Sequence, residues 1–310
     1  MIVRSKFIQL ITLSALVVVA TVIAACSSEE EATIEKAEAS GKLVSSDWML
    51  ENLDNEDVVV VDLRKEEDYA AGHIPGAIQL TPKAVFQQED ENGVAGMLPA
   101  AAHIATALSE LGIEPSDTVV FYDSNSNLWA SRALWAMDVY GHSDSKLIDG
   151  SWNYWSANEL KTSTDVPEIT ASNYAFTAAP DLSIIAGWEE VLESVDDPSK
   201  IVCDTRSPEE FSGKDVRAAA GGHIPESSNV NWNRSVNEQG EFLPAAELRV
   251  IYEGEGIQGD KVVFTLCQTA VRATHSWFVL QELLGYETVK VYDGSWTEWG
   301  NRTDLPITTR

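Results

Sequence analysis

Basic residues are scarce in this sequence. Its 310 residues include 21 Lys and Arg against 49 Asp and Glu, so the formal net charge at pH 7 is −28. Proteins that bind nucleic acid neutralise phosphates with clustered Lys and Arg, and so we expect no nucleic-acid partner. Hydrophobic residues make up 44% of the chain, which suits a globular protein, and the length is enough for two ordinary domains.

Cysteine and histidine are also few. The three cysteines, Cys26, Cys203 and Cys267, lie in unlike contexts and are too few for a disulfide scaffold. A bridge between Cys203 and Cys267 is the one pairing to check. The five histidines are scattered, with no cysteine or carboxylate at ligand spacing, which argues against a metal site. Neither a Gly-x-Gly-x-x-Gly nor a Walker A run occurs, so we expect no cofactor.

The N-terminus has the layout of a secretory signal peptide. Arg4 and Lys6 precede an almost wholly apolar run, residues 7–25, which ends in Ile-Ala-Ala before Cys26. We predict a signal peptide over residues 1–25, lipidation of Cys26 because the site resembles a bacterial lipobox, and a flexible acidic tether over residues 26–42. The alternative is an uncleaved membrane anchor. Both place the globular part outside the cytoplasm, on the periplasmic or extracellular face of a bacterial membrane.

The rest of the chain repeats itself once. Four short segments recur in the same order at similar offsets, which indicates a tandem duplication rather than a solenoid. The matched segments are 58–64 with 201–206, Gly-His-Ile-Pro at 72–75 with 222–225, 118–122 with 261–265, and Asp-Gly-Ser-Trp at 149–152 with 293–296. The second copy carries an insertion, residues 213–221, before its Gly-His-Ile-Pro segment.

Within each copy, short apolar runs alternate with helical patterns. The strands predicted in the first copy are 58–63, 77–80, 119–122 and 146–148, and the helices are 46–53, 66–71, 101–111 and 130–140. This alternation predicts an α/β fold, with a mostly parallel sheet and helices on both faces. We expect two such domains, a first domain over residues 43–161 and a second domain over residues 183–310. A linker rich in Thr, Ser, Ala and Pro, residues 162–182, joins them.

One strand–loop–helix segment organises the second copy. Residues 262–266 are typical of a buried strand, and apolar residues at helical spacing predict a helix over 273–284 that ends at Gly285. The loop between them starts at Cys267 and ends at Arg272. Its N–H groups, the positive end of the helix dipole and Arg272 would all favour the thiolate, which is the nucleophilic form of cysteine. The alternative, a buried structural cysteine, is disfavoured by this spacing.

Residues 261–278 resemble the active-site loop of rhodaneses, the thiosulfate and 3-mercaptopyruvate sulfurtransferases. Residues 292–300, Tyr-Asp-Gly-Ser-Trp-Thr-Glu-Trp-Gly, resemble the closing motif of their catalytic domain. The resemblance covers residues 40–310 and implies two tightly packed tandem rhodanese-like domains, with the linker wrapped around the surface and a non-catalytic first domain. It also implies that sulfane sulfur moves from thiosulfate or 3-mercaptopyruvate, through a persulfide on Cys267, to cyanide or a thiol.

The backbone N–H groups of the loop are predicted to hold the persulfide anion, by the logic of an oxyanion hole. The substrate-binding residues predicted in this loop are Gln268, Thr269, Ala270, Val271 and Arg272. Asp204 and Arg206 follow a strand at a sheet edge, where ligands often bind. The alternative for this pair is a salt bridge that pins a loop, and its recurrence as Asp62 and Arg64 in the first copy favours that alternative.

The first copy has no cysteine at the corresponding place. Aligned with Thr265-Leu266-Cys267 it has Tyr122-Asp123-Ser124, which predicts Ser124 opposite Cys267. No Gly-x-Ser-x-Gly turn surrounds Ser124, so a hydrolase nucleophile is disfavoured.

The histidines have structural and catalytic alternatives. His73 and His223 recur in the two Gly-His-Ile-Pro segments, which favours a turn-stabilising role over catalysis. His275 follows the Cys267 loop on the predicted helix, and a hydrogen bond near that loop is one interpretation.

Two loop positions depart from the family pattern. Thiosulfate-specific members resemble Cys-Arg-x-Gly-x-Arg, whereas this chain has Gln268 in place of the first cation and Ala270 in place of glycine. Losing a cation beside a dianion is expected to raise the Michaelis constant. Ala270 strains the loop if its φ must be positive. The residues that flank the loop are closer to the thiosulfate branch than to the mercaptopyruvate branch.

Three functions follow from these observations, and a sulfurtransferase is favoured. A sulfur-binding or carrier lipoprotein with little turnover is the alternative that Ala270 suggests. A dual-specificity phosphatase is disfavoured, because related phosphatases have one more residue between Cys and Arg. The partners expected are a small sulfur donor, a small acceptor and the membrane through the lipid anchor, with the protein a monomer.

Overall fold

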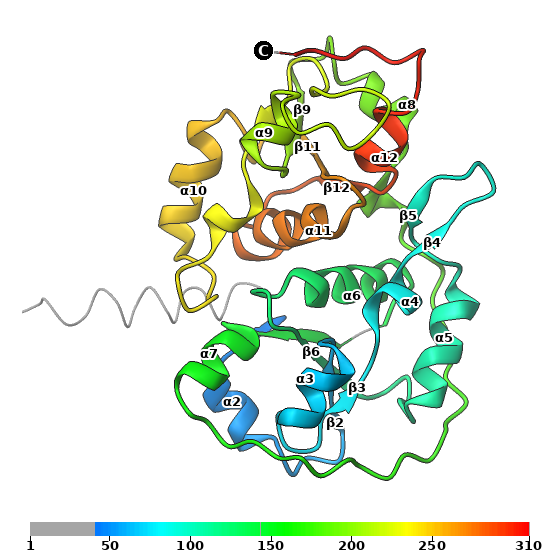
Figure 1. Cartoon of the computed structure of the whole chain (residues 1–310), viewed down its shortest axis with the longest axis vertical. Coiled ribbons are helices and arrows are strands. Elements are labelled where there is room, and N and C mark those ends of the chain that lie inside the picture. The colour runs from blue at the N-terminus through cyan, green and yellow to red at the C-terminus, as the bar shows by residue number, and fades with distance from the viewer. Residues whose placement is uncertain (1–40, 143, 310) are drawn as a thin grey trace, which may run out of the picture.

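The computed structural model describes residues 41–142 and 144–309. The predicted signal peptide, the lipidation site Cys26 and almost all of the acidic tether lie outside the described residues. None of the helices in the described ranges is long and apolar enough to cross a membrane. Figure 1 shows two domains, one above the other, each built on a sheet flanked by helices.

The first domain contains a parallel sheet of five strands in the order β1-β7-β6-β2-β3. Its strands are β1 (Leu43–Val44), β2 (Val58–Asp62), β3 (Ile78–Gln79), β6 (Thr118–Tyr122) and β7 (Ser145–Ile148). Helices α2 (Ser46–Glu51), α3 (Glu66–Ala71) and α7 (Ser151–Ala157) cover one face, and α4 (Pro82–Phe86), α5 (Ala101–Glu110) and α6 (Leu128–Val139) cover the other. The prediction of a sheet covered on both faces is confirmed.

The second domain repeats this plan with the order β10-β9-β11-β12-β8, again all parallel. Its strands are β8 (Ile185–Ala186), β9 (Lys200–Asp204), β10 (Ser228–Asn229), β11 (Val262–Leu266) and β12 (Val289–Tyr292). The helices are α8 (Trp188–Leu192), α9 (Pro208–Phe211), α10 (Ala245–Gly254), α11 (Val271–Phe278) and α12 (Ser295–Trp299), with short turns η1 (Leu182–Ile184), η2 (Trp232–Ser235) and a π-helical turn η3 (Val279–Leu283). The predicted stop at Gly285 is confirmed, because its φ of 68° ends the helix.

The strand register corrects the alignment of the two copies by one residue. Asp62 pairs with Tyr122 across β2 and β6, and Asp204 pairs with Leu266 across β9 and β11. Tyr122 therefore corresponds to Leu266, not to Thr265 as the sequence alignment predicted. The next residues, Asp123 and Cys267, then correspond to each other.

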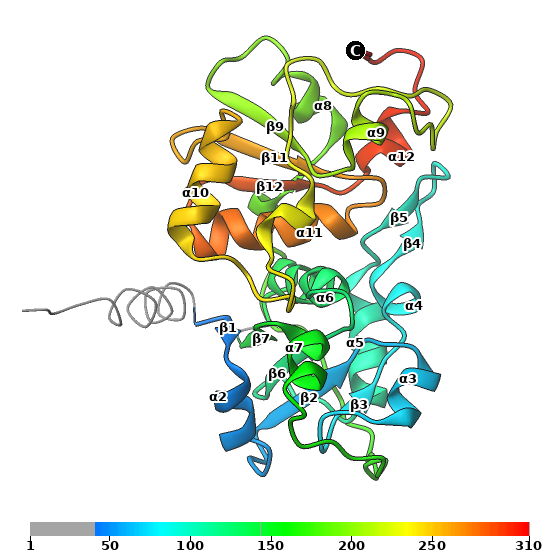
Figure 2. The same ribbon diagram turned by 60° about the vertical axis from the view of Figure 1, so that its left-hand side comes forward.

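The two domains share one hydrophobic core. Helices α6 and α11 lie side by side between the two sheets in both views (Figures 1 and 2). A continuous cluster of buried apolar side chains runs from Val61 and Phe121, through Trp135 on α6 and Trp277 on α11, to Val263 of the second sheet. The tight packing implied by the resemblance is therefore present.

A buried ion pair crosses this interface. Arg132 Nη1 on α6 donates to Asp293 Oδ1 at 2.6 Å, and both side chains are almost completely buried. Asp293 Oδ2 also accepts from the backbone N–H of Leu98, which follows the hairpin β4–β5 (Gln88–Glu89 and Ala95–Met97) of the first domain. Because Asp293 begins the Asp-Gly-Ser-Trp motif of the second domain, the first domain helps to position that motif.

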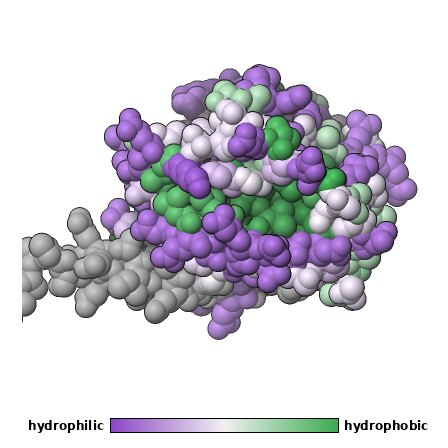
Figure 3. All heavy atoms as spheres, turned by 90° about the horizontal axis from the view of Figure 1, so that it is seen from below, coloured by the Kyte–Doolittle hydropathy of each residue, from purple (hydrophilic) through white to green (hydrophobic). Residues whose placement is uncertain are grey.

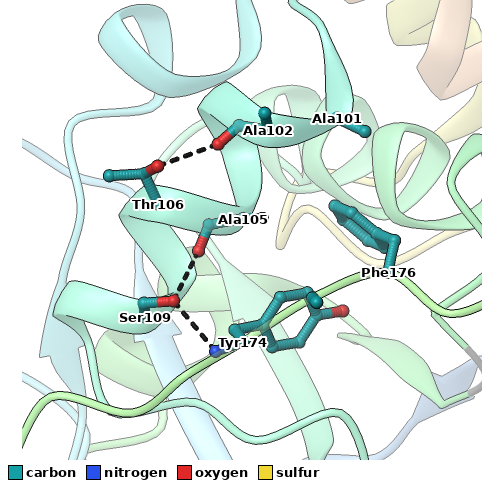
Figure 4. Close-up of a pocket in the computed structure, with 8 residues that line it drawn as sticks. Ala101, Ala102, Ala105, Thr106, Ser109, Tyr174 and Phe176 are labelled. Carbon is teal, nitrogen blue, oxygen red and sulfur yellow. Dashed lines mark hydrogen bonds between the residues drawn. The ribbon is translucent and has the colours of Figure 1, made fainter.

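The linker follows the surface of the first domain, as the resemblance implied. Seen from the first-domain end, a band of hydrophobic side chains lies between hydrophilic ones (Figure 3). Within the linker, Tyr174 N–H donates to Ser109 Oγ on α5 at 2.9 Å. A cavity of about 400 Å³ lies between α5 and this part of the linker, lined by the rings of Tyr174 and Phe176 (Figure 4). The linker is thus a packed part of the first domain.

Candidate active site

Cys267 is the first residue after β11 and lies before the N-terminus of α11. Its backbone N–H donates to Ser295 Oγ at 3.2 Å, and its carbonyl accepts from Trp296 N–H at 3.0 Å. The Asp-Gly-Ser-Trp motif therefore holds the cysteine in place. The residue is 1% exposed, so the thiol is almost inaccessible to solvent in this structure.

The loop from Cys267 to Ala270, here called the Cys267 loop, turns sharply into α11. Ala270 is the N-cap, with φ 60° and ψ −7°. This is the left-handed region, in which a Cβ is strained and glycine is favoured. The departure from glycine at this position therefore does place strain in the loop. The helix starts at Val271, two residues earlier than predicted, so Arg272 lies in its first turn.

The first domain has the same arrangement around Asp123. Asp123 N–H donates to Ser151 Oγ at 2.8 Å, and its carbonyl accepts from Trp152 N–H at 3.0 Å, which repeats the contacts of Cys267. The following N-cap, Asn127, has φ 65°. Asp123, not Ser124 as predicted, therefore stands opposite Cys267. The prediction failed because it matched residues 119–121 with the identical Val-Val-Phe at 262–264, which lies one residue out of the structural register. The loop from Asp123 to Asn127, here called the Asp123 loop, is one residue longer than the Cys267 loop.

The Asp123 carboxylate fills a cradle of backbone N–H groups. Its two oxygens accept from four N–H groups at distances of 2.7 to 3.1 Å, from Asn125, Asn127, Trp129 and Ala130. Loop N–H groups and a helix N-terminus that converge on one point are suited to an anion. Among the described residues, the N–H groups from Gln268 to Arg272 in the second domain show no hydrogen bond to a protein acceptor. The Cys267 loop therefore has the form of the same cradle without its carboxylate.

Arg272 lies beside Cys267 and is paired with Glu210. Its Nη1 and Nη2 donate to the two Glu210 oxygens at 2.6 and 2.8 Å. Burial alone would raise the pKa of Glu210, but the hydrogen bonds and charge of Arg272 bring that pKa down to about 2. Arg217 of the insertion approaches the same carboxylate, with Nη1 at 3.4 Å from Oε1. Arg272 is thus shared: burial alone would lower its pKa, but its pairing with Glu210 and the interaction of its charge with the Cys267 side chain together raise that pKa.

Neighbouring segments cover the Cys267 loop on two sides. Gln268 Nε2 donates to the carbonyl of Arg217 at 3.1 Å, so the insertion lies against the loop. Gln87 of the first domain donates through Nε2 to the carbonyl of Thr269 at 2.8 Å. A Cβ on Gly96 of the hairpin would come within 2.7 Å of Thr269 Cβ. The candidate site is therefore built by both domains.

Val271, the last of the predicted loop residues to be placed, is the first residue of α11 and is 7% exposed.

Asp204 and Arg206 form a salt bridge with each other. Arg206 Nε donates to Asp204 Oδ1 at 2.9 Å, its Nη2 donates to the carbonyl of Gly222 at 2.8 Å, and its guanidinium lies 4.1 Å from the ring of Trp296. Both side chains are buried. Asp62 and Arg64 repeat the pair in the first domain. These contacts are those of the salt-bridge alternative, while a role of the pair in donor binding stays a prediction.

The histidines of the Gly-His-Ile-Pro segments lie in packed turns. His73 stacks on Tyr69 with ring centroids 3.9 Å apart, and its Nδ1 lies 2.9 Å from the Tyr69 carbonyl. His223 stacks on Phe211 in the same way, at 3.8 Å. Both positions agree with turn stabilisation.

His275 contacts the first domain. Its Nε2 lies 3.1 Å from the carbonyl of Ser126 in the Asp123 loop, so Nε2–H donates to that oxygen. Burial lowers the pKa of His275 to about 3, against a weaker opposing effect of this hydrogen bond. The hydrogen bond interpreted as lying near the Cys267 loop is therefore made instead to the Asp123 loop of the other domain.

Cys203 and Cys267 are both free thiols. Cys203 lies within β9 and pairs with Thr265 on β11. Burial raises the pKa of Cys203, and the charge of Asp204 adds to the shift, so this thiol is disfavoured as a nucleophile. In the described ranges, no group of three or more His, Cys, Asp or Glu side chains could hold a metal ion.

The sequence interpretation missed Glu210, Arg217, Gln87 and the serine that anchors each loop. Ser207 and Glu210 do carry a local signal, because Ser-x-x-Glu is the pattern of a capping box, and the structure contains that box at α9. The Ser-Trp of each repeated motif was also visible, but its bond to the cysteine could not be seen without the fold.

Comparison with known proteins shows that one family model matches two segments of the chain. The family model for the rhodanese-like domain matches residues 45–158 and 188–302. A Saccharopolyspora erythraea protein named "Putative thiosulfate sulfurtransferase" is 38% identical over 274 residues, which cover 86% of this chain and 95% of the relative. A Thermus thermophilus protein named "Sulfur carrier protein TtuD" is 38% identical over 279 residues, with 86% and 95% covered.

Solved structures share the fold. An anaerobic ergothioneine biosynthesis enzyme from Chlorobium limicola, in complex with trimethyl histidine, superposes with a TM-score of 0.75 at 25% identity. The match covers 86% of this chain and 70% of that chain.

Proposed function

This chain belongs to the family of proteins with rhodanese-like domains, and we propose that it is a sulfurtransferase that moves sulfane sulfur through a persulfide on Cys267. The names of relatives that match nearly their full length support this activity. The observation that carries the proposal is the pair of equivalent loops. One cradle holds the Asp123 carboxylate, and the other surrounds the only cysteine that lies at such a loop among the described residues.

The first half-reaction loads the enzyme. The Cys267 thiolate attacks the outer sulfur of thiosulfate, its electron pair forms the new S–S bond, and the S–S bond of the donor breaks to release sulfite. The product is the persulfide anion Cys-S-S⁻, so covalent catalysis divides the transfer into two easier steps. 3-Mercaptopyruvate is the alternative donor.

The second half-reaction unloads the enzyme. A nucleophile such as cyanide attacks the terminal sulfur of the persulfide, the S–S bond breaks, and the Cys267 thiolate is restored. With cyanide the product is thiocyanate, and with a thiol it is a new persulfide.

The Cys267 loop stabilises the charged states on this path. In the first domain, the four N–H groups that bind Asp123 come from the end of the loop and the first turn of α6. The N–H groups from Gln268 to Arg272 have the corresponding place before and within the first turn of α11. They would donate to the terminal sulfur of the persulfide, which is larger and softer than a carboxylate oxygen but carries the same charge.

The direct test is thiocyanate formation from thiosulfate and cyanide. The purified chain is expected to turn over, Cys267→Ser to be inactive, and Cys203→Ser to retain activity. Activity that survives Cys267→Ser would contradict the proposal.

A second candidate function is a sulfur carrier with little turnover. The strained Ala270, the almost complete burial of Cys267 and the name of the Thermus thermophilus relative favour it. The two candidates are separated by the time course with excess donor and cyanide. A carrier releases about one thiocyanate per chain, whereas an enzyme continues beyond that.

We also propose that the mature protein is monomeric, exported and anchored to a bacterial membrane through lipid on Cys26, which lies outside the described residues. Metabolic labelling with radioactive palmitate tests the anchor. Label that persists in Cys26→Ser, or no label in the natural sequence, would contradict it.

A further inference from the structure

The charges around the Cys267 loop are balanced. Two arginines, Arg272 and Arg217, lie beside two carboxylates, Glu210 and Asp215. Arg272 is bidentate to Glu210, and Arg217 Nη2 lies 2.6 Å from Asp215 Oδ2. The two terminal nitrogens of Arg272 that donate to Glu210 are the same donors with which an arginine binds an anionic ligand.

Glu210 is fixed in this position. Its side chain is 1% exposed, and it belongs to the capping box of α9, in which one of its oxygens accepts from Ser207 N–H. Because its carboxylate is bonded to Arg272, it also lowers the positive potential that Arg272 presents to a donor at Cys267.

The other polar residues of the Cys267 loop carry no positive charge that could offset the charge of Glu210. Gln268 is neutral, and its Nε2 is shared between the Arg217 carbonyl and Thr297 Oγ1. Thr269 is neutral and is tied to Gln87 of the first domain. The whole chain carries a net charge of −28, so the long-range field opposes the approach of a multiply charged anion.

From this arrangement we infer that Glu210 is a specificity-determining residue that disfavours doubly charged donors, so that the site favours a donor with at most one negative charge at its reacting end, an organic persulfide R–S–SH. This inference rests on the proposed function, because it concerns the donor of the same persulfide. Thiosulfate, a dianion, is then a working but poorer donor.

The persulfide step balances without any further reactant. The Cys267 thiolate forms a bond to the outer sulfur of R–S–SH, the S–S bond of the donor breaks, and R–S⁻ leaves. The proton of the donor remains on the transferred sulfur, so the enzyme carries Cys-S-SH, which can ionise in the cradle.

The experiment compares the loading of Cys267 by two donors, thiosulfate and cysteine hydropersulfide. The full chain is mixed rapidly with each donor, quenched with acid, and the mass of the intact protein gives the second-order rate constant. Glu210→Gln keeps the size of the side chain and the capping-box pattern, in which Gln can replace Glu. Glu209→Gln removes the same charge from an exposed position of the same helix and is the matched control.

We expect the natural chain to load faster from the hydropersulfide. Glu210→Gln should raise the rate constant for thiosulfate by about tenfold, the effect of roughly one partly screened unit charge. The constant for the hydropersulfide should change much less, and Glu209→Gln should change neither. Equal changes for both donors, or no gain with thiosulfate, would overturn the inference.

Salt dependence of the natural chain gives a second measurement that needs no variant. With the local cations paired and the overall charge negative, the rate constant for thiosulfate should stay level or rise with ionic strength. A steep fall would mean that an unpaired cation faces the donor, and would overturn the inference. If neither donor adds sulfur to Cys267, the proposed function itself fails, and this outcome is distinct from loading with an unchanged preference.

Discussion

Asp123 and Cys267 occupy equivalent places in the two domains, each held by the serine of an Asp-Gly-Ser-Trp motif. Ser151 Oγ accepts from Asp123 N–H at 2.8 Å, and Ser295 Oγ accepts from Cys267 N–H at 3.2 Å. Where one domain has a thiol, the other has a carboxylate that already occupies the cradle of N–H groups. Burial raises the pKa of Asp123 and the four N–H groups oppose that shift. The first domain thus displays the converging N–H donors that the second domain would use for a persulfide.

The first prediction concerns this internal anion. Asp123→Asn places an amide NH₂ against backbone N–H groups that now donate to carboxylate oxygens, so at least one buried donor loses its partner. The free energy of unfolding should fall by about 1–3 kcal/mol, as measured by urea denaturation. Asp68→Asn, at an exposed position on α3, should stay within about 0.5 kcal/mol of the natural chain. Equal stability of the two variants would show that the carboxylate is not held by the cradle.

The second prediction concerns the strain at Ala270. Ala270→Gly removes the Cβ at φ 60° and should stabilise the protein by about 1 kcal/mol. Ala273→Gly lies within α11 and should instead destabilise it by about 1 kcal/mol, because glycine is a poor helix former. Thermal unfolding of the two variants measures the difference. If Ala270→Gly is also destabilising, the left-handed assignment of this residue is wrong.

The third prediction concerns the interface between the domains. Arg132→Met leaves the buried Asp293 carboxylate without its ionic partner, and breaking a buried pair in this way costs about 3–5 kcal/mol. Since Asp293 begins the motif that holds Cys267, activity should fall together with stability. Urea denaturation and the thiocyanate assay measure the two effects. Lys65→Met, which removes an exposed cation that lies 3.8 Å from Glu67, should alter neither.

The fourth prediction concerns pH. The imidazole of His275 has a pKa of about 3 in the folded protein against an ordinary value of 6.5. As the pH falls, this imidazole is protonated in the unfolded chain before it is protonated in the folded protein. The free energy of unfolding therefore decreases from pH 6.5 towards pH 3, by up to about 1.4 kcal/mol per pH unit. His275→Gln should flatten this part of the stability profile, whereas His103→Gln, at an exposed position, should not. A slope that survives in His275→Gln would assign the effect to another group.

Much of the fold could be predicted from the sequence because the repeat and the strand patterns are local signals. The strands β2, β6 and β11 and the stop at Gly285 follow from short apolar runs and a glycine. The alignment of Ser124 with Cys267 was wrong because the matching Val-Val-Phe letters of the two strands lie one residue out of register, and hydrophobicity alone does not fix that register. The hairpin β4–β5 was missed because its polar and glycine-rich residues do not alternate as a half-buried strand does.

The site was predictable only in part for a similar reason. Cys267 and Arg272 lie five positions apart and form a local motif, but Glu210 reaches Arg272 from 62 residues away. Its charge was visible in the sequence, whereas its place beside the loop depends on the packing of α9. Likewise, the partner of His275 is a backbone carbonyl in the other domain, and a backbone carbonyl carries no sequence signal.

Mass spectrometry of the protein after treatment with thiosulfate would detect the proposed persulfide itself. Digestion and peptide mapping should find one added sulfur on Cys267 and none on Cys203, and the added sulfur should disappear on treatment with cyanide. Sulfur on Cys203, or no added sulfur at all with thiosulfate, 3-mercaptopyruvate and cysteine hydropersulfide, would contradict the central claim that the Cys267 loop holds a persulfide.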